Sequence, residues 1–368
     1  MTSIVKYVSV LSYLAAIFAY EDRAAPLTQQ PFLGDPYLDP VCPDAHAIFP
    51  CFCYIVDDHL MNLDCSGVMD ELEMLLVFKT VSPETSFKKF QVMENKNVQV
   101  LAEGALDRTS FREIIFNKGK LFLVESNFAK PSFHTANKLD FSGNEIVNFP
   151  FQDLPKFPVL KDLFLTGNTI VTFPVLQSAS LERLSLSYNP IGALPPGAFD
   201  DLPSLVVIDL EHTYLNFLFP GTFSNLRSLA YLFLGYNDIT HIDEGVFDLV
   251  APNLTVIGLS HNYLTTLSSE ALSGLPPGVS LYLDSNRIEN LEEDNWKPIL
   301  RKQVEIWLAD NPLICDCKVR WLADQILLHK QVILATCPDG KDLINLGKKD
   351  FTNCTPEDTI DQSFKIRD

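Results

Sequence analysis

The chain has 368 residues, of which 47% are apolar, so it has enough apolar surface for a large core and is not disordered overall. Its 47 acidic and 28 basic residues give a formal charge of −19, which disfavours nucleic acid, heparin and anionic membrane surfaces as partners. Its 16 glycines and 24 prolines are too few for a collagenous or low-complexity chain.

The first twenty residues have the pattern of a secretory signal peptide. Lys6 precedes an apolar run over residues 7–19, which is shorter than the roughly 20 residues that cross a bilayer. We expect residues 1–20 to be removed on export and the stretch 21–41, which contains several prolines, to form a tail. The polar residues 355–368 carry no anchor signal. The sequence therefore predicts a secreted, extracellular protein without a membrane anchor.

The eight cysteines form two clusters of four, near the two ends of the chain. Thiols of exported proteins normally oxidise, so each cluster predicts a disulfide-closed cap, over 42–86 and 311–354. Each cluster contains a Cys-x-Cys pair whose members cannot easily bond each other, and spacing leaves the pairing otherwise open. A zinc site is the weaker alternative, because structural zinc prefers Cys-x2–4-Cys spacing. The cysteines are Cys42, Cys51, Cys53, Cys65, Cys315, Cys317, Cys337 and Cys354.

Residues 87–310 between the caps are an internal repeat of the form L-x-x-L-x-L-x-x-N-x-L. One clear copy consists of Leu181, Leu184, Leu186, Asn189 and Ile191. The ninth position recurs every 21 to 25 residues through about ten copies. Its residues are Asn95, Gly119, Asn144, Asn168, Asn189, Thr213, Asn237, Asn262, Asn286 and Asn311.

Each part of the repeat indicates a structural role. The alternating x-L-x-L-x core predicts a short strand whose leucines point inward, and the Asn can bond backbone groups where the chain leaves that strand. Ten residues after the Asn, Phe199, Phe223 and Phe247 predict a second apolar row. A single coil cannot bury its own leucines, so the coils must stack. We therefore expect an α/β horseshoe solenoid of about ten coils, with a concave parallel sheet and capped ends.

The sequence contains no pattern that indicates catalysis. A Gly-rich phosphate loop, a G-x-S-x-G elbow and an H-E-x-x-H motif are all missing. His212 and His261 share one column of the predicted sheet, but two coils separate them. At about 4.8 Å per strand they would lie roughly 10 Å apart, which is wide for ligands of one zinc ion. We predict a non-enzyme with no catalytic residue, no cofactor and no metal.

The concave face predicts a contact surface for a protein partner. Aromatic residues recur at positions that point away from the leucine core, and an exposed patch of this kind is typical of a binding site. The alternative is that the rings cover one another and serve only sheet packing. Arg112, Lys118, Lys138 and Lys161 form a basic start to this face. The predicted partner-binding residues are Phe164, Tyr188, Tyr231, Phe233, Tyr236, Tyr282 and Trp307.

Two sequons predict N-glycosylation, at Asn253 and at Asn353. Asn253 lies just before a predicted strand, near the edge of the sheet. Asn353 is followed directly by Cys354, so we expect it to be the less accessible of the two.

The repeats and both caps resemble those of the extracellular leucine-rich repeat family. The C-terminal cap matches through Cys315-Asp316-Cys317, Trp321-Leu322 and Cys337 to Cys354, and the N-terminal cap through Cys42-Pro43 and Cys51-x-Cys53. In that family the cap cysteines pair first to third and second to fourth. The resemblance therefore implies Cys42–Cys53, Cys51–Cys65, Cys315–Cys337 and Cys317–Cys354.

The N-terminal cap resembles a narrower, crustacean group of these proteins. The stretches 42–53 and 63–68 and the following Phe87-x-x-Phe90 are similar to the group that includes the non-catalytic subunit of a secreted luciferase-type monooxygenase. The resemblance implies a non-catalytic scaffold that stabilises a partner, such as a small secreted oxidoreductase, on its concave face. The competing hypothesis is an immune or adhesion module that recognises a microbial or cell-surface ligand.

Overall fold

The computed structural model describes residues 42–56, 60–81, 85–325, 328 and 330–355. Contacts divide the chain into Met1–Asp39 and Pro40–Asp368. The first unit lies outside the described residues, as do the predicted signal peptide, the tail 21–41 and nearly all of 355–368. Among the helices that are described, none has the length and apolar character needed to cross a membrane.

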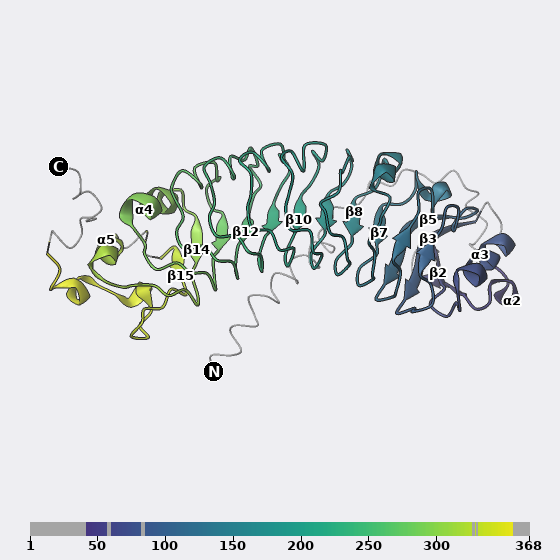
Figure 1. Ribbon diagram of the computed structural model, residues 1–368, viewed down its shortest axis with the longest axis horizontal. Coiled ribbons are helices and arrows are strands. Elements are labelled where there is room, and N and C mark those ends of the chain that lie inside the picture. Colours follow the sequence, from purple (N-terminus) through teal and green to yellow (C-terminus); the bar gives the residue numbers. More distant parts are fainter. Residues whose placement is uncertain (1–41, 57–59, 82–84, 326–327, 329, 356–368) are drawn as a thin grey trace. The chain divides into compact units, whose positions relative to one another are not determined.

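The described part of the second unit is built on one thirteen-stranded sheet, in the order β1-β2-β3-β5 and then β7 through β15 (Figure 1). The first pair is antiparallel, and every later neighbour is parallel, as stacked coils require. The strands of the coils are β3 Ser86–Met93, β5 Ser110–Asn117, β7 Lys138–Asp140, β8 Asp162–Phe164, β9 Arg183–Ser185, β10 Val207–Asp209, β11 Tyr231–Phe233, β12 Val256–Gly258, β13 Ser280–Tyr282 and β14 Glu305–Trp307. The coil-and-sheet architecture predicted from the repeats is confirmed.

The N-terminal cap adds a hairpin and two helices to the first coil. It consists of α2 Ala45–Ile48, β1 Phe52–Val56, β2 Leu60–Asp64 and α3 Glu71–Thr80. Asp70 starts α3 by accepting a hydrogen bond from the Glu73 backbone N–H, an N-cap contact. In the first coils, β4 Val100–Leu101 and β6 Leu123–Val124 form a separate small parallel pair.

The C-terminal cap closes the last coil with short segments. Its elements are η4 Cys317–Val319, α5 Arg320–Ala323, β15 Val332–Ile333, η5 Leu343–Asn345 and η6 Lys348–Phe351. Trp321 is 9% exposed and donates its indole N–H to the Leu291 carbonyl at 2.8 Å, which ties the cap to the coil before it. The remaining helical pieces lie within the coils and are η2 Lys130–Ser132, η3 Phe151–Lys156 and α4 Glu293–Arg301.

In most coils the turn out of the strand contains a buried side-chain amide. Asn237 is 4% exposed, and its Nδ2 donates to the carbonyls of Leu210, Leu234 and Gly235 at 2.9–3.1 Å. Its Oδ1 accepts the backbone N–H groups of Thr213 and Leu215 at 3.0 Å. These contacts join one coil to the preceding one, so the predicted Asn ladder is confirmed.

The two copies without Asn show what that position requires. Thr213 donates its hydroxyl to the Leu210 carbonyl and lets the next coil's Asn237 bond its backbone. Gly119 has no polar side chain, and the next coil's Asn144 accepts its N–H at 3.2 Å. A Cβ at Gly119 would lie 2.6 Å from the Asn95 carbonyl oxygen, so only glycine fits there.

The predicted second apolar row is present. The rings of Phe199 and Phe223 stack with centroids 5.7 Å apart, and those of Phe223 and Phe247 at 6.1 Å. In the first coils, other phenylalanines fill the core. The ring centroids of Phe90 and Phe111, for example, are 5.1 Å apart. Coil-to-coil stacking therefore buries two rows, one of aliphatic strand residues and one of phenylalanines.

All eight cysteines are paired, two disulfides in each cap. The bonds are Cys42–Cys53, Cys51–Cys65, Cys315–Cys337 and Cys317–Cys354, the pairing implied by the family resemblance. With a bond inside each Cys-x-Cys pair excluded, the spacing had left two pairings open in each cluster.

We predict that Asn237→Ala destabilises the solenoid by at least about 2 kcal/mol, because it leaves several buried backbone groups without a partner. Thermal and urea unfolding followed by circular dichroism measure the change. Asn225→Ala is the matched control, since Asn225 is exposed and makes one side-chain bond, to Asp200. Equal midpoints for the two variants would contradict the role assigned to the ladder.

Candidate functional site

The outward positions of the strands form continuous columns across the sheet. In β10, β11 and β12 the middle residues Ile208, Leu232 and Ile257 are fully buried, so the residues on either side of each point away from the core. Strand pairing aligns the third residues of the strands directly. In order, they are Asp140, Phe164, Ser185, Asp209, Phe233, Gly258, Tyr282 and Trp307. We call this side of the sheet the strand face.

The aromatic residues predicted on this face differ in accessibility. Tyr282 and Trp307 stack with centroids 5.1 Å apart, and both remain partly exposed. The Trp307 indole N–H is buried and has no hydrogen-bond partner among the described residues. Tyr231 is partly exposed at the start of β11. Phe164 is also partly exposed, beneath the Lys138 ammonium at 5.3 Å.

The expectation that Phe233 contributes to an exposed patch is wrong. Its side chain is only 3% exposed. The next residue in its column is Gly258, and a Cβ placed there would lie 3.4 Å from the Phe233 ring. The ring therefore packs over the space left by a missing side chain, and Phe233 belongs to sheet packing.

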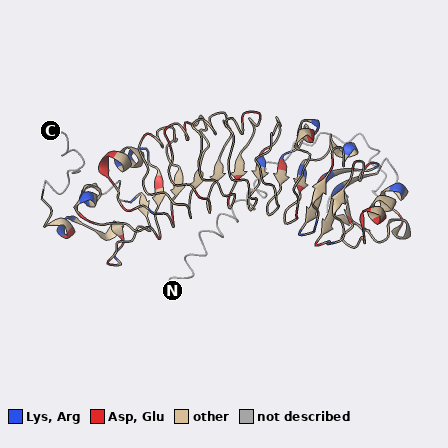
Figure 2. Cartoon of the chain, in the orientation of Figure 1, with Lys and Arg blue, Asp and Glu red and all other residues tan. Residues whose placement is uncertain are grey.

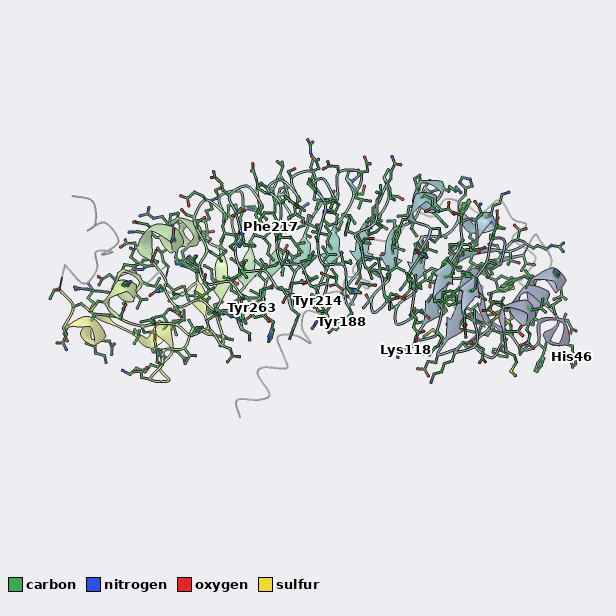
Figure 3. All side chains as sticks on the ribbon, in the orientation of Figure 1. His46, Lys118, Tyr188, Tyr214, Phe217 and Tyr263 are labelled. Atoms are coloured by element: carbon green, nitrogen blue, oxygen red, sulfur yellow. A yellow bond between two sulfur atoms is a disulfide. The ribbon has the colours of Figure 1, made fainter. Side chains whose placement is uncertain are left out.

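A ladder of four stacked rings runs beside the strands. Tyr188, His212, Tyr236 and His261 come from four consecutive coils, with successive centroids 4.1, 4.2 and 4.1 Å apart and planes within 18° of parallel. We call these four residues the aromatic ladder. Tyr188 is 56% exposed, and it is labelled in Figure 3 on the opposite side of the strands from Phe217.

The ladder follows from the same turn as the buried amides. Each of its residues directly precedes the ninth repeat position and has φ between 53° and 56°, the left-handed region. The corresponding residues of the other coils, from Glu94 to Asp310, also have positive φ. The turn therefore fixes the direction of each ring, and coil spacing brings the rings into stacking distance. All four residues occupy the eighth position of the repeat, so the sequence predicts that side chains of adjacent coils lie within reach of one another, but it does not predict that the rings stack.

Two further exposed tyrosines lie next to the ladder and were missed. Tyr214 and Tyr263 each follow the ninth position and are 64% and 40% exposed (Figure 3). The Arg287 guanidinium lies 4.2 Å from the Tyr263 ring centroid, a cation–π contact from the next coil. Their shared position in the repeat is a signal that could have found them.

The carboxylates of Asp209 and Glu211 lie close enough to Tyr188, the first residue of the aromatic ladder, for their charges to act on it. The hydroxyls of Ser185 and Ser187 both donate to Asp209 Oδ2 at 2.7 Å, and the Glu211 N–H donates to Asp209 Oδ1 at 3.2 Å. Burial nevertheless raises the pKa of Asp209. Burial first, and the charge of Asp209 second, raise the pKa of Glu211 to about 7.

The same surroundings shift the pKa values of the four side chains of the aromatic ladder. Burial, and then the charge of Glu211, raise the pKa of both Tyr188 and Tyr236, so their hydroxyls remain protonated donors. Burial lowers the pKa of His212 and His261, so both imidazoles are neutral at neutral pH. The four side chains of the aromatic ladder are therefore uncharged at neutral pH, and the carboxylate that lies beside them, Glu211, titrates near pH 7.

Two of the four residues of the basic start lie beside carboxylates of neighbouring coils. Lys161 forms an ion pair with Glu182 at 2.9 Å, and Lys118 lies 3.9 Å from Glu94. Arg183 and Asp162 form a partly buried pair, with Nε to Oδ1 at 2.5 Å. These charges fix one another across neighbouring coils, which leaves little net positive charge on this part of the face.

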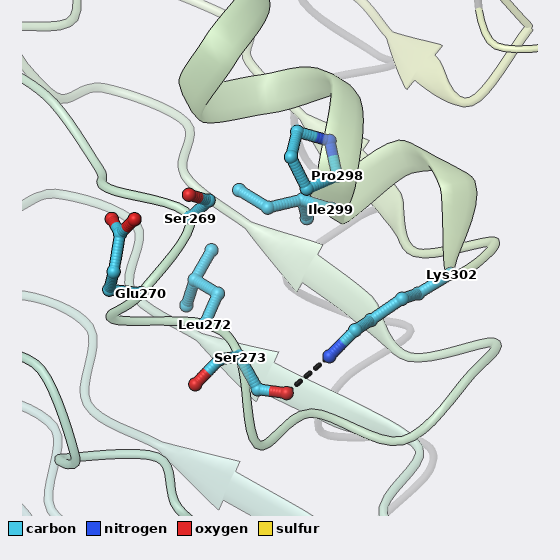
Figure 4. A pocket seen from close by; sticks show the side chains of 7 residues that line it. All are labelled: Ser269, Glu270, Leu272, Ser273, Pro298, Ile299 and Lys302. Carbon is cyan, nitrogen blue, oxygen red and sulfur yellow. Dashed lines mark hydrogen bonds between the residues drawn. The ribbon is translucent and has the colours of Figure 1, made fainter.

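The structure offers no catalytic constellation within the residues it describes. No group of three His, Cys, Asp or Glu side chains there could hold a metal ion. A small hollow lies between the coil at Ser269–Ser273 and α4, where the Lys302 ammonium donates to the Ser273 carbonyl (Figure 4). Its lining combines two serines, a glutamate and aliphatic side chains without a nucleophile–base pair.

The two predicted glycosylation sites are both exposed. Asn253 precedes β12, and Asn353 lies in the C-terminal cap beside Cys354. The adjoining disulfide therefore does not bury Asn353. Their glycosylation stays a prediction, which the mass of the purified protein before and after enzymatic deglycosylation would measure.

Comparison with known proteins identifies the repeats and a near full-length relative. The family model described as "Leucine rich repeat" matches residues 179–239 and 229–288. The chain is 32% identical over 312 residues to the oplophorus-luciferin 2-monooxygenase non-catalytic subunit of Oplophorus gracilirostris, covering 84% of this chain and 87% of that protein.

Solved structures share the architecture at lower identity. Human trophoblast glycoprotein (5T4) is 24% identical with a TM-score of 0.50, covering 65% of this chain and 94% of that one. A chain from the octameric complex of latrophilin 3, Unc5D and the leucine-rich repeat protein FLRT2 is 18% identical with a TM-score of 0.58, covering 76% and 86%. These two matches show the fold alone.

We predict that Glu211→Gln stabilises the protein at high pH but not at low pH. The folded-state pKa of about 7 lies above the ordinary value of 4.5. A carboxyl of this kind favours the folded state below pH 4.5, and the benefit disappears as pH rises towards 7. Near pH 8 the wild type therefore carries a cost on the order of 2–3 kcal/mol that the variant avoids.

Thermal midpoints of the variant and wild type, compared between about pH 4.5 and pH 8, measure this difference. Glu244→Gln is the control, because Glu244 is an exposed glutamate of the following coil. A constant difference across the pH range would contradict the assigned shift.

Proposed function

The chain belongs to the leucine-rich repeat family that includes the oplophorus-luciferin 2-monooxygenase non-catalytic subunit, and we propose that it is itself a non-catalytic binding subunit. The near full-length match to that subunit is the observation that carries the proposal. The match extends over 84% of the chain, more than the repeats 87–310 alone account for. The chain holds a protein partner, and the chemistry belongs to the partner.

We place partner binding on the strand face and the ladder beside it. Tyr188 and Tyr214 are more than half exposed, and Tyr231, Tyr236 and Tyr282 are partly exposed. Tyrosine and tryptophan are enriched at binding hot spots, because they combine a large apolar ring with a hydrogen-bonding group. The unpartnered Trp307 N–H supports the assignment, since a partner's acceptor would satisfy it. Phe164 and Trp307 extend the surface towards the two ends, and Phe233 is excluded.

We propose that the partner is a small secreted oxidoreductase of the luciferase type, which the chain stabilises. Four disulfides support an extracellular setting, because such bonds persist in oxidising compartments. A protein that binds only the folded state of its partner raises the partner's stability by mass action. A purified chain should therefore show no turnover alone and should raise the thermal midpoint of the partner.

The native mass of the protein distinguishes a binding subunit from an immune or adhesion recognition module. We expect size exclusion of the protein from its own source to show a second chain in fixed stoichiometry, which mass spectrometry then identifies. A lone monomer that associates only when a microbial or cell-surface ligand is added would contradict the subunit function and support recognition.

We predict that Tyr231→Ala weakens partner binding about tenfold or more, as expected for a central aromatic contact, with little change in the thermal midpoint. Calorimetric titration of the partner measures the affinity. Phe217→Ala is the control, because it removes a partly exposed ring on the other side of the strands (Figure 3). If binding is retained and the midpoint falls sharply, Tyr231 serves packing and the assigned face is wrong.

A further inference from the structure

The strand face divides into two parts with different charge. From β3 to β9 its outward positions mix both signs, as in Lys89, Glu113, Lys138, Asp162 and Arg183. From β10 to β14 the strands and the three residues after each contain no Lys or Arg, and the strands carry no blue in Figure 2. Their carboxylates are Asp209, Glu211, Asp284, Glu305 and Asp310. We call this part, with the aromatic ladder, the acidic half-face.

Glu211 is a carboxylate of the half-face to which no described residue donates a hydrogen bond. Ser185 and Ser187 both donate to Asp209, and Asp284 receives the Ala309 N–H at 2.9 Å. The carboxylate of Glu211 makes no hydrogen bond or ion pair within the described residues, although it is largely covered. Its partly accessible carboxylate can therefore accept a hydrogen bond from a group outside the chain.

The next coil has a glycine, and so no side chain, at the place where the Glu211 carboxylate lies. A Cβ at Gly235 would lie 2.9 Å from Glu211 Oε1, so the carboxylate rests against a glycine backbone. The tyrosines of the neighbouring coils, Tyr188 and Tyr236, lie close enough to experience its charge. The position before Tyr188 in the ladder column is Gly167, so no side chain of that column covers the outer face of the Tyr188 ring.

We propose that the acidic half-face receives a basic segment of the protein partner, with one Lys or Arg side chain bound at Glu211 beside the aromatic ladder. A guanidinium or ammonium group supplies the donors that Glu211 lacks, in a charge-assisted hydrogen bond. The open face of Tyr188 adds a cation–π surface. The inference rests on the proposed function, since it names the chemistry of the partner at the same face.

Binding at this position should depend on pH. The groups that face Glu211 are Asp209 on its own coil, Tyr188 and Tyr236 on the neighbouring coils, and His212, which follows it; His261 lies beyond Tyr236. Burial and Asp209 raise the pKa of Glu211 to about 7, so its charge decreases as pH falls through neutrality. The histidines gain positive charge over more acidic pH. Both changes weaken the binding of a cation as pH falls.

The test uses the purified chain and a short fluorescent peptide of alternating arginine and glycine, with fluorescence anisotropy at physiological ionic strength. We expect Glu211→Gln to weaken peptide binding about fivefold at pH 8, while Glu244→Gln, which removes the same charge from an exposed site, changes it less than about twofold. Wild-type affinity should fall about threefold between pH 8 and pH 6, and Glu211→Gln should reduce that dependence to the part that comes from the histidines.

Glu211→Asp keeps the charge but withdraws it by one methylene. Weaker binding by this variant supports a positioned contact, and binding equal to that of the wild type would overturn it. Equal losses in Glu211→Gln and Glu244→Gln would mean that the peptide responds only to the charge of −19 spread over the chain, and would also overturn the inference. Undetectable peptide binding by the wild type would do the same.

The outcomes also separate this inference from the proposed function. If Tyr231→Ala weakens binding of the co-purified partner but the peptide does not distinguish Glu211 from Glu244, the binding face is correct and the basic segment is wrong. If the partner is retained by Tyr231→Ala while the peptide result holds, Glu211 binds cations but the proposed face is wrong.

Discussion

The turn by which the chain leaves each strand is the constraint on which the structure depends. One residue takes up the left-handed conformation, and the next, usually Asn, inserts its amide among backbone groups of its own coil and the one before. Buried N–H and C=O groups that would otherwise be orphaned are thereby satisfied. Because the amides join consecutive coils, the leucine rows are held in register and the core can grow in one dimension.

The candidate site is a second consequence of that turn. The residue that precedes the amide cannot point into the core, so its side chain, where it has one, lies beside the strand face. Four consecutive aromatic residues at this position form the ladder from Tyr188 to His261, at ring spacings of 4.1–4.2 Å. A binding surface built on stacked coils is rigid, and a rigid surface loses little conformational entropy when a partner docks.

The sequence predicted the coils, both rows of core residues and the Asn ladder, because each follows from spacing within one repeat. Properties that depend on the neighbouring coil were harder to predict. Phe233 is buried because Gly258 on the next strand leaves space for its ring. The pKa of Glu211 is raised first by its burial and then by the charge of Asp209. The disulfide pairing followed from family resemblance and could not be chosen from the cysteine spacing alone.

Partner binding on the strand face is the central claim, and radical footprinting of the native complex tests it most directly. Oxidation of aromatic side chains, read by mass spectrometry, reports which rings a partner covers. The account predicts that Tyr188, Tyr231 and Tyr282 lose reactivity in the complex relative to the free chain, while Phe217 keeps it. Protection of Phe217 with no change at the three tyrosines would contradict the claim.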